Sequence, residues 1–225
     1  MATTLAFDVY GTLIDTFGIH RLLANMLDDS RAKACANRWR EKQLEYSFRR
    51  GLMDQYQPFP VCTRDALEFT CEELELPLTA AQKHDLMESY RTLPAFPDVK
   101  PALALLQPAG HRMYPFSNGP ANEVTALLDN AGLLDYFLDI ISVDEVQTFK
   151  PAPAVYRHFL ARSGAEAGAC WLISGNPFDV LGAAACGMRT AWLKRNPKAV
   201  FDPWGREPDH TLTELTGLAT ALLTP

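Results

Sequence analysis

The sequence contains no apolar run of the roughly 20 residues that a membrane-spanning helix needs. It also lacks the start of a secretory signal, in which a basic segment precedes a separate apolar stretch, because the first residues enter a strand-like pattern directly. These two absences predict a cytoplasmic protein that has no membrane partner.

A block of basic residues is missing as well, and the formal net charge of the 225 residues is −6. Nucleic-acid binders carry concentrated positive charge, so the sequence argues against a nucleic-acid partner and favours a small-molecule substrate. A chain of this length forms one large domain, or a core with a smaller inserted unit.

The cysteines are odd in number and lack any Cys-x-x-Cys pair. We therefore interpret them as reduced packing residues rather than as disulfide partners, zinc ligands or nucleophiles. The five positions are Cys35, Cys62, Cys71, Cys170 and Cys186.

What the chain does have is an apolar stretch, residues 5–13, that contains an acid and then turns on a glycine. Asp8 follows the apolar residues 5–7, Gly11 permits a turn, and Thr12 offers a hydroxyl group. Open α/β sheets bind ligands at the carboxyl ends of their strands, which makes Asp8 a candidate reactive group. By itself the pattern fits equally well a strand followed by an Asx-type turn.

Apolar periodicity divides the chain into a helical block and an alternating block. In the first block, helices are expected over residues 31–53, 63–75 and 79–90, with a capping box of Thr79 and Gln82. In the second block, strands are expected at 112–116, 140–142, 170–174 and 190–194, and helices at 100–107, 120–130, 151–162 and 178–186.

Alternation of strands and helices predicts an α/β fold with a parallel sheet covered by helices on both faces. We expect a Rossmann-like core of residues 1–15 and 98–225 and an inserted helical cap of residues 16–97. Because the insertion follows the first strand, it would lie over the carboxyl edge of the sheet as a lid.

Three further strand ends carry polar groups. Ser117 and Asn118 stand before a helix-opening proline, which is typical of an anion site at a helix N-terminus or of a plain helix cap. Lys150 also precedes a proline; a lysine beside a carboxylate keeps that carboxylate ionised, whereas an isolated lysine is usually a solvated charge. The third strand end carries Ser174, Asn176 and Asp179.

These four strand ends resemble, in their order along the chain, the four motifs of the haloacid dehalogenase superfamily. They carry Asp8, Ser117, Lys150 and the group of Ser174, Asn176 and Asp179. In that superfamily the first Asp is a nucleophile. Phosphatases of that superfamily carry a second Asp, which protonates the alkoxide leaving group, where this chain has Tyr10. They also carry a metal-binding Asp where this chain has Gly175, which offers no side chain to a cation. Both differences argue against phosphoryl transfer.

The segment Ser174-x-Asn176-x-Phe178-Asp179 and the helix around Arg40 resemble the L-2-haloacid dehalogenases, which often have a second serine and a tryptophan at positions 175 and 178. The resemblance implies hydrolysis of short (S)-2-haloalkanoic acids to (R)-2-hydroxy acids, with inversion and through an ester on Asp8. It also implies a haloacid and a halide as ligands, no cofactor or metal, and a homodimer.

Two alternatives stay open at this stage. One is a phosphatase of the same fold, in which Asp8 and Asp179 would gather a weak metal site. The other is a non-catalytic member of the superfamily that has been retained as a binding module.

The resemblance also assigns roles to individual residues. The expected catalytic residues are Asp8, Thr12, Arg40, Ser117, Lys150, Ser174, Asn176 and Asp179. The expected substrate-binding residues are Val9, Tyr10, Arg40, Phe59, Ser117, Asn118, Tyr156 and Phe178.

Arg40 would hold the leaving halide between the apolar walls of Phe59 and Phe178, and Ser117 and Asn118 would bind the substrate carboxylate.

Thr12 and Asn176 would support Asp8 and the hydrolytic water, while Ser174 and Asp179 would hold Lys150. An unpaired Asp179 would raise the pKa of Asp8, so we expect it to contact Lys150. A solvated position for Arg40 and core positions for the aromatic residues, Tyr156 included, are the alternative interpretations.

Overall fold

A computed structural model describes residues 3–223 of the chain. Within them, six parallel strands form one sheet in the order β3-β2-β1-β4-β5-β6. The strands are β1 (Thr4–Phe7), β2 (Arg112–Ser117), β3 (Ile141–Ser142), β4 (Cys170–Ser174), β5 (Arg189–Leu193) and β6 (His210–Leu212). The α/β fold expected from the alternating pattern is confirmed.

Strand β1 lies at the centre of the sheet, between β2 and β4. All four of its residues are buried, because helices cover both faces of a parallel sheet. The strand order reverses at β1, and open α/β sheets bind ligands at this point of reversal. Phe7 pairs with Pro115 on one side and with Ile173 on the other, so Asp8 emerges between the carboxyl ends of β2 and β4.

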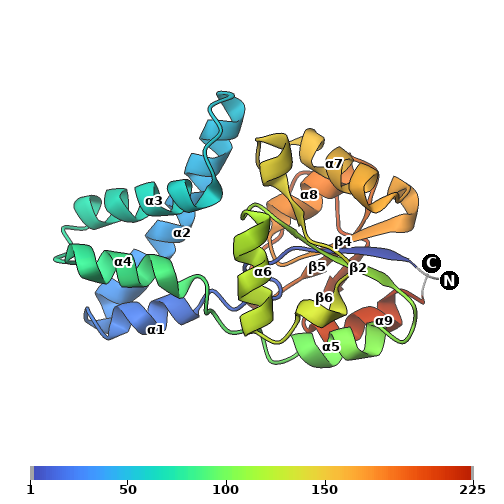
Figure 1. Cartoon of the computed structure of the whole chain (residues 1–225), viewed down its shortest axis with the longest axis horizontal. Helices are drawn as coiled ribbons and strands as arrows, with labels where there is room; N and C mark the ends of the chain where they lie inside the picture. Colours follow the sequence, from blue (N-terminus) through green and yellow to red (C-terminus); the bar gives the residue numbers. More distant parts are fainter. Residues whose placement is uncertain (1–2, 224–225) are drawn as a thin grey trace.

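Five helices cover the sheet, in two layers (Figure 1). They are α5 (Val99–Leu106), α6 (Ala121–Asn130), α7 (Pro153–Ser163), α8 (Pro177–Ala185) and the short α9 (Leu218–Ala221). Leu5 and Phe7 pack into the cluster that α5, α6 and α9 complete, whereas Ala6 packs into the cluster of α7 and α8. Successive strand residues point to opposite faces, so β1 contributes to both cores.

Residues between β1 and α5 form four helices that lie beside the sheet layers (Figure 1). They are α1 (Gly18–Ala24), α2 (Asp29–Leu52), α3 (Phe59–Glu73) and α4 (Ala80–Ser89). The expected capping box is present, since Thr79 accepts from the N–H of Gln82 and Gln82 accepts from the N–H of Thr79. The boundaries proposed for core and cap stay a prediction, and we use the word cap below for α1–α4.

Two parts of the fold differ from the sequence-based expectation. Helix α3 begins at Phe59 and not at residue 63. A proline in the first turn of a helix removes no internal hydrogen bond, because the N–H groups of that turn have no partner inside the helix. The Pro58–Pro60 cluster therefore starts the helix and does not break it. The short elements β6 and α9 were not expected, because a strand of three residues without a buried side chain and a four-residue helix leave no clear apolar period.

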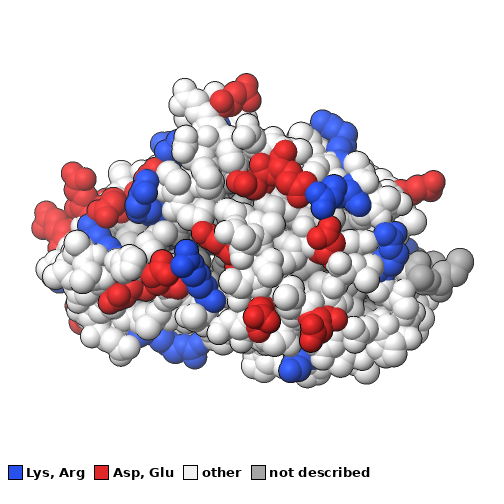
Figure 2. All heavy atoms as spheres, viewed as in Figure 1, with Lys and Arg blue, Asp and Glu red and all other residues white. Residues whose placement is uncertain are grey.

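The surface and the cysteines agree with the compositional analysis. Acidic and basic side chains are interspersed on the face shown in Figure 2, without a continuous basic surface there. All five cysteines are free, and four of them are buried. None of the helices formed by residues 3–223 is both long and apolar enough to pass through a bilayer.

Candidate active site

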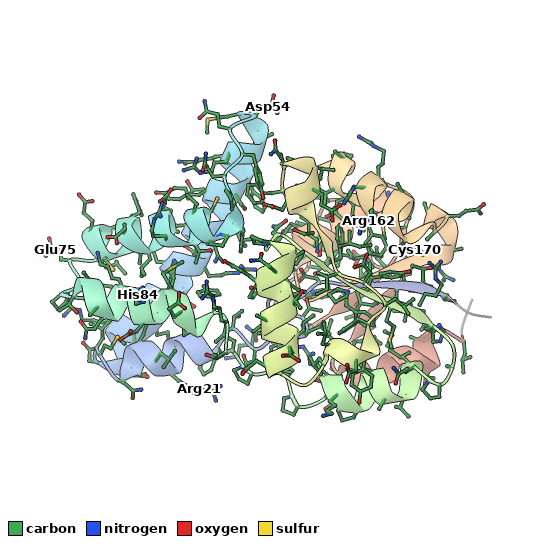
Figure 3. The ribbon with its side chains drawn as sticks, viewed as in Figure 1. Arg21, Asp54, Glu75, His84, Arg162 and Cys170 are labelled. Carbon is green, nitrogen blue, oxygen red and sulfur yellow. The ribbon has the colours of Figure 1, made fainter. Side chains whose placement is uncertain are left out.

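The carboxyl ends of the central strands face the cap. Cys170, at the start of β4, lies on the side of the core away from the cap, so β4 runs toward the cap and ends there at Ser174 (Figure 3). Asp8 follows β1 at the same edge and is 7% exposed. Parallel strands thus bring residues that are more than 160 positions apart in the sequence to one edge of the sheet.

The carboxylate of Asp8 accepts hydrogen bonds unequally on its two oxygens. Oδ2 accepts from the Thr12 hydroxyl at 2.7 Å, from the Asn176 amide at 2.7 Å and from the Ser174 hydroxyl at 3.1 Å. Among the residues that the structure describes, Oδ1 accepts only from Nζ of Lys150, at 3.2 Å. Oδ2 is therefore saturated with donors, while Oδ1 keeps a lone pair for a ligand.

Lys150 joins Asp8 to the second carboxylate of the site. Its ammonium donates to Asp8 at 3.2 Å, to Asp179 at 2.8 Å and to the carbonyl of Phe116 at 2.8 Å, and the residue is 1% exposed. The expected contact between Lys150 and Asp179 is thus present. The expected contact between Lys150 and Ser174 is absent among residues 3–223, because the Ser174 hydroxyl donates to Asp8 instead. The other oxygen of Asp179 accepts from the Tyr156 hydroxyl at 2.8 Å, so both carboxylate oxygens are paired.

The two carboxyl groups have opposite pKa shifts. Burial alone would raise the pKa of Asp8, but the charge of Lys150 and hydrogen bonds from Thr12, Lys150 and Asn176 outweigh it and hold that pKa below its usual value. Burial and the nearby charge of Asp8 raise the pKa of Asp179, although Lys150 and Tyr156 oppose the change. The negative charge of the pair therefore favours Asp8.

Lys150 itself stays charged in this environment. Burial lowers the pKa of a lysine, but the charges of Asp179 and Asp8 outweigh that effect and raise the pKa of Lys150. The result is an ionised carboxylate whose charge is balanced without a metal ion.

Arg40 approaches the same group from helix α2 of the cap. One guanidinium nitrogen donates to the Asn176 side-chain carbonyl at 3.3 Å and another donates to Gln43 at 2.6 Å. Burial lowers the pKa of Arg40, and the charge of Asp8 opposes this change. Arg40 is half-buried at the cap–core contact and is not one of the solvated charges of α2.

Ser117 is the last residue of β2 and Asn118 is the first residue after it, and both are buried. The Ser117 hydroxyl accepts from the N–H of Gly119 at 3.0 Å and, within residues 3–223, has no acceptor for its own proton. The Asn118 carbonyl accepts from the backbone N–H of Lys150 at 3.0 Å, so this amide positions the lysine loop. Neither residue caps α6, because Pro120 stands at that position without a side-chain bond.

The aromatic residues expected at the site occupy two places. The Phe59 ring lies 6.5 Å from the Tyr10 ring and 6.1 Å from the Phe149 ring. Phe178 packs instead against Phe48 of α2, with ring centroids 5.2 Å apart. Phe59 thus adjoins the loop that follows Asp8, whereas Phe178 lies at the contact between α2 and α8.

Two of the expected substrate-binding residues have fully buried side chains. Val9 is fully buried in the core, so only its backbone can face a ligand. Tyr156 is also fully buried, and its hydroxyl bonds to Asp179, so its side chain positions that carboxylate. Periodicity could not distinguish these roles, because it shows which residues are buried and not which groups they meet.

A small cavity of about 80 Å³ lies between cap and core. Tyr10 and Gly119 reach it from the core, and α3 and α4 close its other side. Its lining residues are Tyr10, Phe59, Pro60, Thr63, Met87, Glu88, Tyr90, Arg91, Gly119 and Glu123.

Comparison with known proteins identifies the family. The family model described as haloacid dehalogenase-like hydrolase matches residues 2–187. The chain belongs to the haloacid dehalogenase-like hydrolases.

Two similar relatives carry names within this family. The (S)-2-haloacid dehalogenase of Pseudomonas sp. (strain YL) is 36% identical over 213 residues, covering 94% of this chain and 90% of its own. Haloacetate dehalogenase H-2 of Moraxella sp. (strain B) is 35% identical, with 92% of each chain covered.

A solved structure of L-2-haloacid dehalogenase from Xanthobacter autotrophicus matches this hydrolase with a TM-score of 0.91 at 30% identity, covering 100% of this chain and 99% of the other. That protein is described with chloropropionic acid covalently bound. The resemblance found in the sequence motifs is confirmed at the level of the family and of the fold.

The magnesium ion used by phosphatases of this superfamily does not fit the residues of this hydrolase. Lys150 lies between the two carboxylates that would have to share the ion. A side chain at Gly175 would bring its Cβ within 3.0 Å of the Gly11 carbonyl oxygen, so this position accepts no ligand-bearing residue without a backbone shift. Among residues 3–223, no group of three or more His, Cys, Asp or Glu residues could hold a metal ion.

Two residues that support this hydrolase's site were not expected from the sequence. Gln43 is fully buried and holds Arg40 in place, while its own amide donates to Thr63 at 2.6 Å. Tyr90 packs against the Tyr10 ring at 6.0 Å and against the Trp39 ring at 5.5 Å. A contact between Gln43 and Arg40 could have been predicted, because a spacing of three residues places both on one face of a helix. No sequence pattern predicted the position of Tyr90.

Proposed function

We propose that this protein hydrolyses the carbon–halogen bond of short (S)-2-haloalkanoic acids and releases (R)-2-hydroxy acids. The observation that carries the proposal is the asymmetric Asp8 carboxylate, with three donors on Oδ2 and Lys150 alone on Oδ1. The cation Arg40, which faces this carboxylate from the cap, supports the halide as the leaving group.

In the first step, Oδ1 of Asp8 attacks the carbon that bears the halogen from the side opposite the halide. The halide leaves with the bonding electron pair toward Arg40, and an ester between Oδ1 and the substrate carbon forms. A halide is a weak base and needs no proton, so Tyr10 can occupy the position of a second acid. The attack inverts the configuration of the carbon once.

In the second step, water attacks the carbonyl carbon of the Asp8 ester, and negative charge develops on Oδ2. Thr12, Ser174 and Asn176 already donate to this oxygen and therefore stabilise the developing charge without rearrangement. The bond between the carbonyl carbon of Asp8 and Oδ1 then breaks, and the leaving oxygen takes up a proton that the attacking water gives up, while the remaining proton goes to solvent. The bond between Oδ1 and the substrate carbon stays intact, so the hydroxy acid keeps the inverted configuration. The oxygen of the water remains in the regenerated carboxylate.

The substrate carboxylate requires donors close to Asp8. The free hydroxyl proton of Ser117 can serve, together with the backbone N–H groups of Tyr10 and Asn118, for which no acceptor occurs within residues 3–223. The cavity of about 80 Å³ beside Tyr10 favours a short substituent on the reacting carbon. The names of the relatives, (S)-2-haloacid and haloacetate dehalogenase, lie within the same substrate class.

The experiment that tests the proposal measures halide release and product chirality from racemic 2-chloropropionate in EDTA, for the wild type and for Asp8→Asn. We expect the wild type to release chloride and D-lactate, and Asp8→Asn to lose at least about a thousandfold in kcat, as when other nucleophiles are removed. A thermal unfolding curve checks that Asp8→Asn is folded.

Release of phosphate from a phosphate ester on addition of magnesium, without chloride release in EDTA, would contradict the proposal. Equal halide release by Asp8→Asn would show that Asp8 is not the nucleophile.

We also propose a cytoplasmic homodimer, in line with the sequence-based expectation. Light scattering after size-exclusion chromatography measures the mass against the 25.0 kDa of one chain, and cell fractionation measures the location. A mass of one chain at micromolar concentration would contradict the dimer, and recovery from the membrane or secreted fraction would contradict the location.

A further inference from the structure

A second cavity, of about 630 Å³, also reaches the site. Gly11 of the Asp8 loop and Arg40 of α2 both line it. Its other walls come from α1, from the first part of α2 and from the loop after β5, so it reaches Arg40 from a different direction than the cavity beside Tyr10.

One face of α2 runs along this second cavity. Lys33, Asn37 and Arg40 all line it, and their spacing of four and three residues places them on the same side of the helix. Lys33 is exposed, whereas Arg40 contacts Asn176 beside Asp8. The face therefore leads from solvent to the reacting groups over about 10 Å of helix, at 1.5 Å per residue.

The lining of the second cavity is positive. Its lining contains three cationic side chains, those of Lys33, Arg40 and Arg195, and one carboxylate, that of Asp15. Asp15 also forms an ion pair of 3.6 Å with Arg21. Asp98 holds the Arg195 guanidinium with two bonds of 2.7 Å, yet Nε of Arg195 is buried without a partner among the described residues. Two cations, Lys33 and Arg40, thus stay without a carboxylate partner within residues 3–223.

The smaller cavity has the opposite character. Its charged lining residues are Glu88, Glu123 and Arg91, and Arg91 is already paired with Glu88 at 2.9 Å. The molecule as a whole is negative, with a formal charge of −6, and the unpaired Glu123 adds negative charge at this cavity, so an anion is disfavoured there among the residues that the structure describes. The second cavity is the better path for an anion.

We propose that the second cavity is the passage through which the anionic substrate enters and the halide leaves, with Lys33 as the guiding cation at its outer end. This inference rests on the proposed dehalogenase activity, because both the 2-haloacid and the halide are anions. Arg40 marks the inner end of the passage and lies where the halide is released.

The first test reverses the outer charge. Lys33→Glu lowers kcat/KM for 2-chloropropionate by about three- to tenfold at low ionic strength, mainly through KM, because the local potential changes sign. Added potassium sulfate reduces the difference, since exposed charges are screened over about 10 Å at 0.1 M salt. Lys100→Glu, at an exposed lysine of α5, makes the same change in net charge away from the cavity and leaves kcat/KM unchanged.

A second pair of variants blocks one cavity at a time. Asn37→Trp places a large side chain between Lys33 and Arg40 and lowers kcat/KM for chloroacetate more than Met87→Trp does. Met87→Trp narrows the smaller cavity, which chloroacetate needs least because its reacting carbon carries no further substituent. The reverse pattern would overturn the proposal and assign the passage to the smaller cavity. Equal effects of Lys33→Glu and Lys100→Glu would show that only net charge matters.

A third test measures bromide binding by titration calorimetry, which does not depend on turnover. Lys33→Glu weakens this binding at least about threefold while Lys100→Glu leaves it unchanged, and an equal affinity in both variants would overturn the passage. If the wild type binds bromide in this charge-dependent way but releases no halide from any haloacid, the proposed function fails and the anion passage stands.

Discussion

Asp8 and Asp179 show how one lysine can serve two carboxylates unequally. Both acids contact Nζ of Lys150, yet Asp8 accepts three further hydrogen bonds while Asp179 accepts one more from a side chain. The number of donors decides where the negative charge lies. The carboxylate that we propose as the nucleophile is therefore kept ionised by its neighbours, and the second acid holds the lysine in place.

This arrangement predicts a broad pH profile. The lowered pKa of Asp8 keeps the nucleophile ionised, so activity is lost only as the pH falls through a value below the usual ~3.9 of aspartate. The raised pKa of Lys150 keeps the cation, so loss of its proton lowers activity only as the pH rises above the usual ~10.4 of lysine. The measurement is kcat/KM for 2-chloropropionate against pH, after preincubation has shown that the enzyme survives each pH. An acid limb centred near pH 6 would show that Lys150 does not control the ionisation of Asp8.

The sequence predicted which residues lie at the site but not all of the contacts that they make there. The strand ends that carry Asp8, Ser117, Lys150 and Ser174 followed from the apolar runs that precede them. The sequence could not show that Tyr156 donates to Asp179, or that the Asn118 carbonyl holds the backbone of Lys150. Such contacts depend on side-chain direction and on packing between elements that are distant in the sequence.

At the scale of elements, helix α8 is fixed to α7 by a close approach. A Cβ at Gly182 of α8 would lie within 3.0 Å of the hydroxyl and ring atoms of Tyr156 in α7. Only a glycine leaves room for the ring, and the ring in turn places the hydroxyl on Asp179. The contact between two helices thus reaches the carboxylate pair of the site.

We therefore expect Gly182→Ala to displace Tyr156 and to break its bond to Asp179. Overpacking of this kind lowers the free energy of unfolding by about 1–3 kcal/mol, and kcat/KM should fall because Asp179 and Lys150 shift with the ring. Urea unfolding and halide-release kinetics measure the two effects. Gly168→Ala is the matched control, because within residues 3–223 its added Cβ meets no heavy atom within 4 Å apart from Gly168 itself and its two chain neighbours. Equal behaviour of both variants would show that the contact does not set the position of Tyr156.

The elements themselves followed largely from the sequence. The predicted bounds of β4 match the structure, and those of α2 differ by one or two residues at each end, because long apolar or periodic segments carry a clear signal. Helix α3 differs because its signal was a pair of prolines, and strand β6 differs because none of its three residues is buried. Proline positions and edge strands depend on tertiary contacts that periodicity does not contain.

At the scale of the whole molecule, cap and core are joined by paired chain segments. The N–H of Asp15 donates to the Pro94 carbonyl at 2.8 Å, and the N–H of Phe96 donates to the Leu13 carbonyl at 3.0 Å. These segments enter and leave the cap side by side. Far from them, the hydroxyl of Tyr56, at the end of the α2–α3 loop, donates to Asp144 of the core.

We predict that Tyr56→Phe weakens the closed contact between cap and core. A hydrogen bond to a charged group contributes about 1.5–3 kcal/mol, so we expect KM for 2-chloropropionate to rise about tenfold while kcat changes less. Steady-state kinetics measures both constants. Tyr136→Phe, at a half-buried tyrosine of the core, serves as the control. An unchanged KM together with a lower free energy of unfolding would mean that the bond supports only the fold.

The close approach of Gly175 to the Gly11 carbonyl also bears on how this enzyme could change its chemistry. The metal-binding acid of the phosphatases is a single residue exchange away in the sequence, from Gly175 to aspartate. The structure opposes this exchange, because the loops after β1 and β4 would have to separate before any side chain could fit between them. An evolutionary or laboratory path from one activity to the other must therefore move the backbone first and exchange the side chain afterwards.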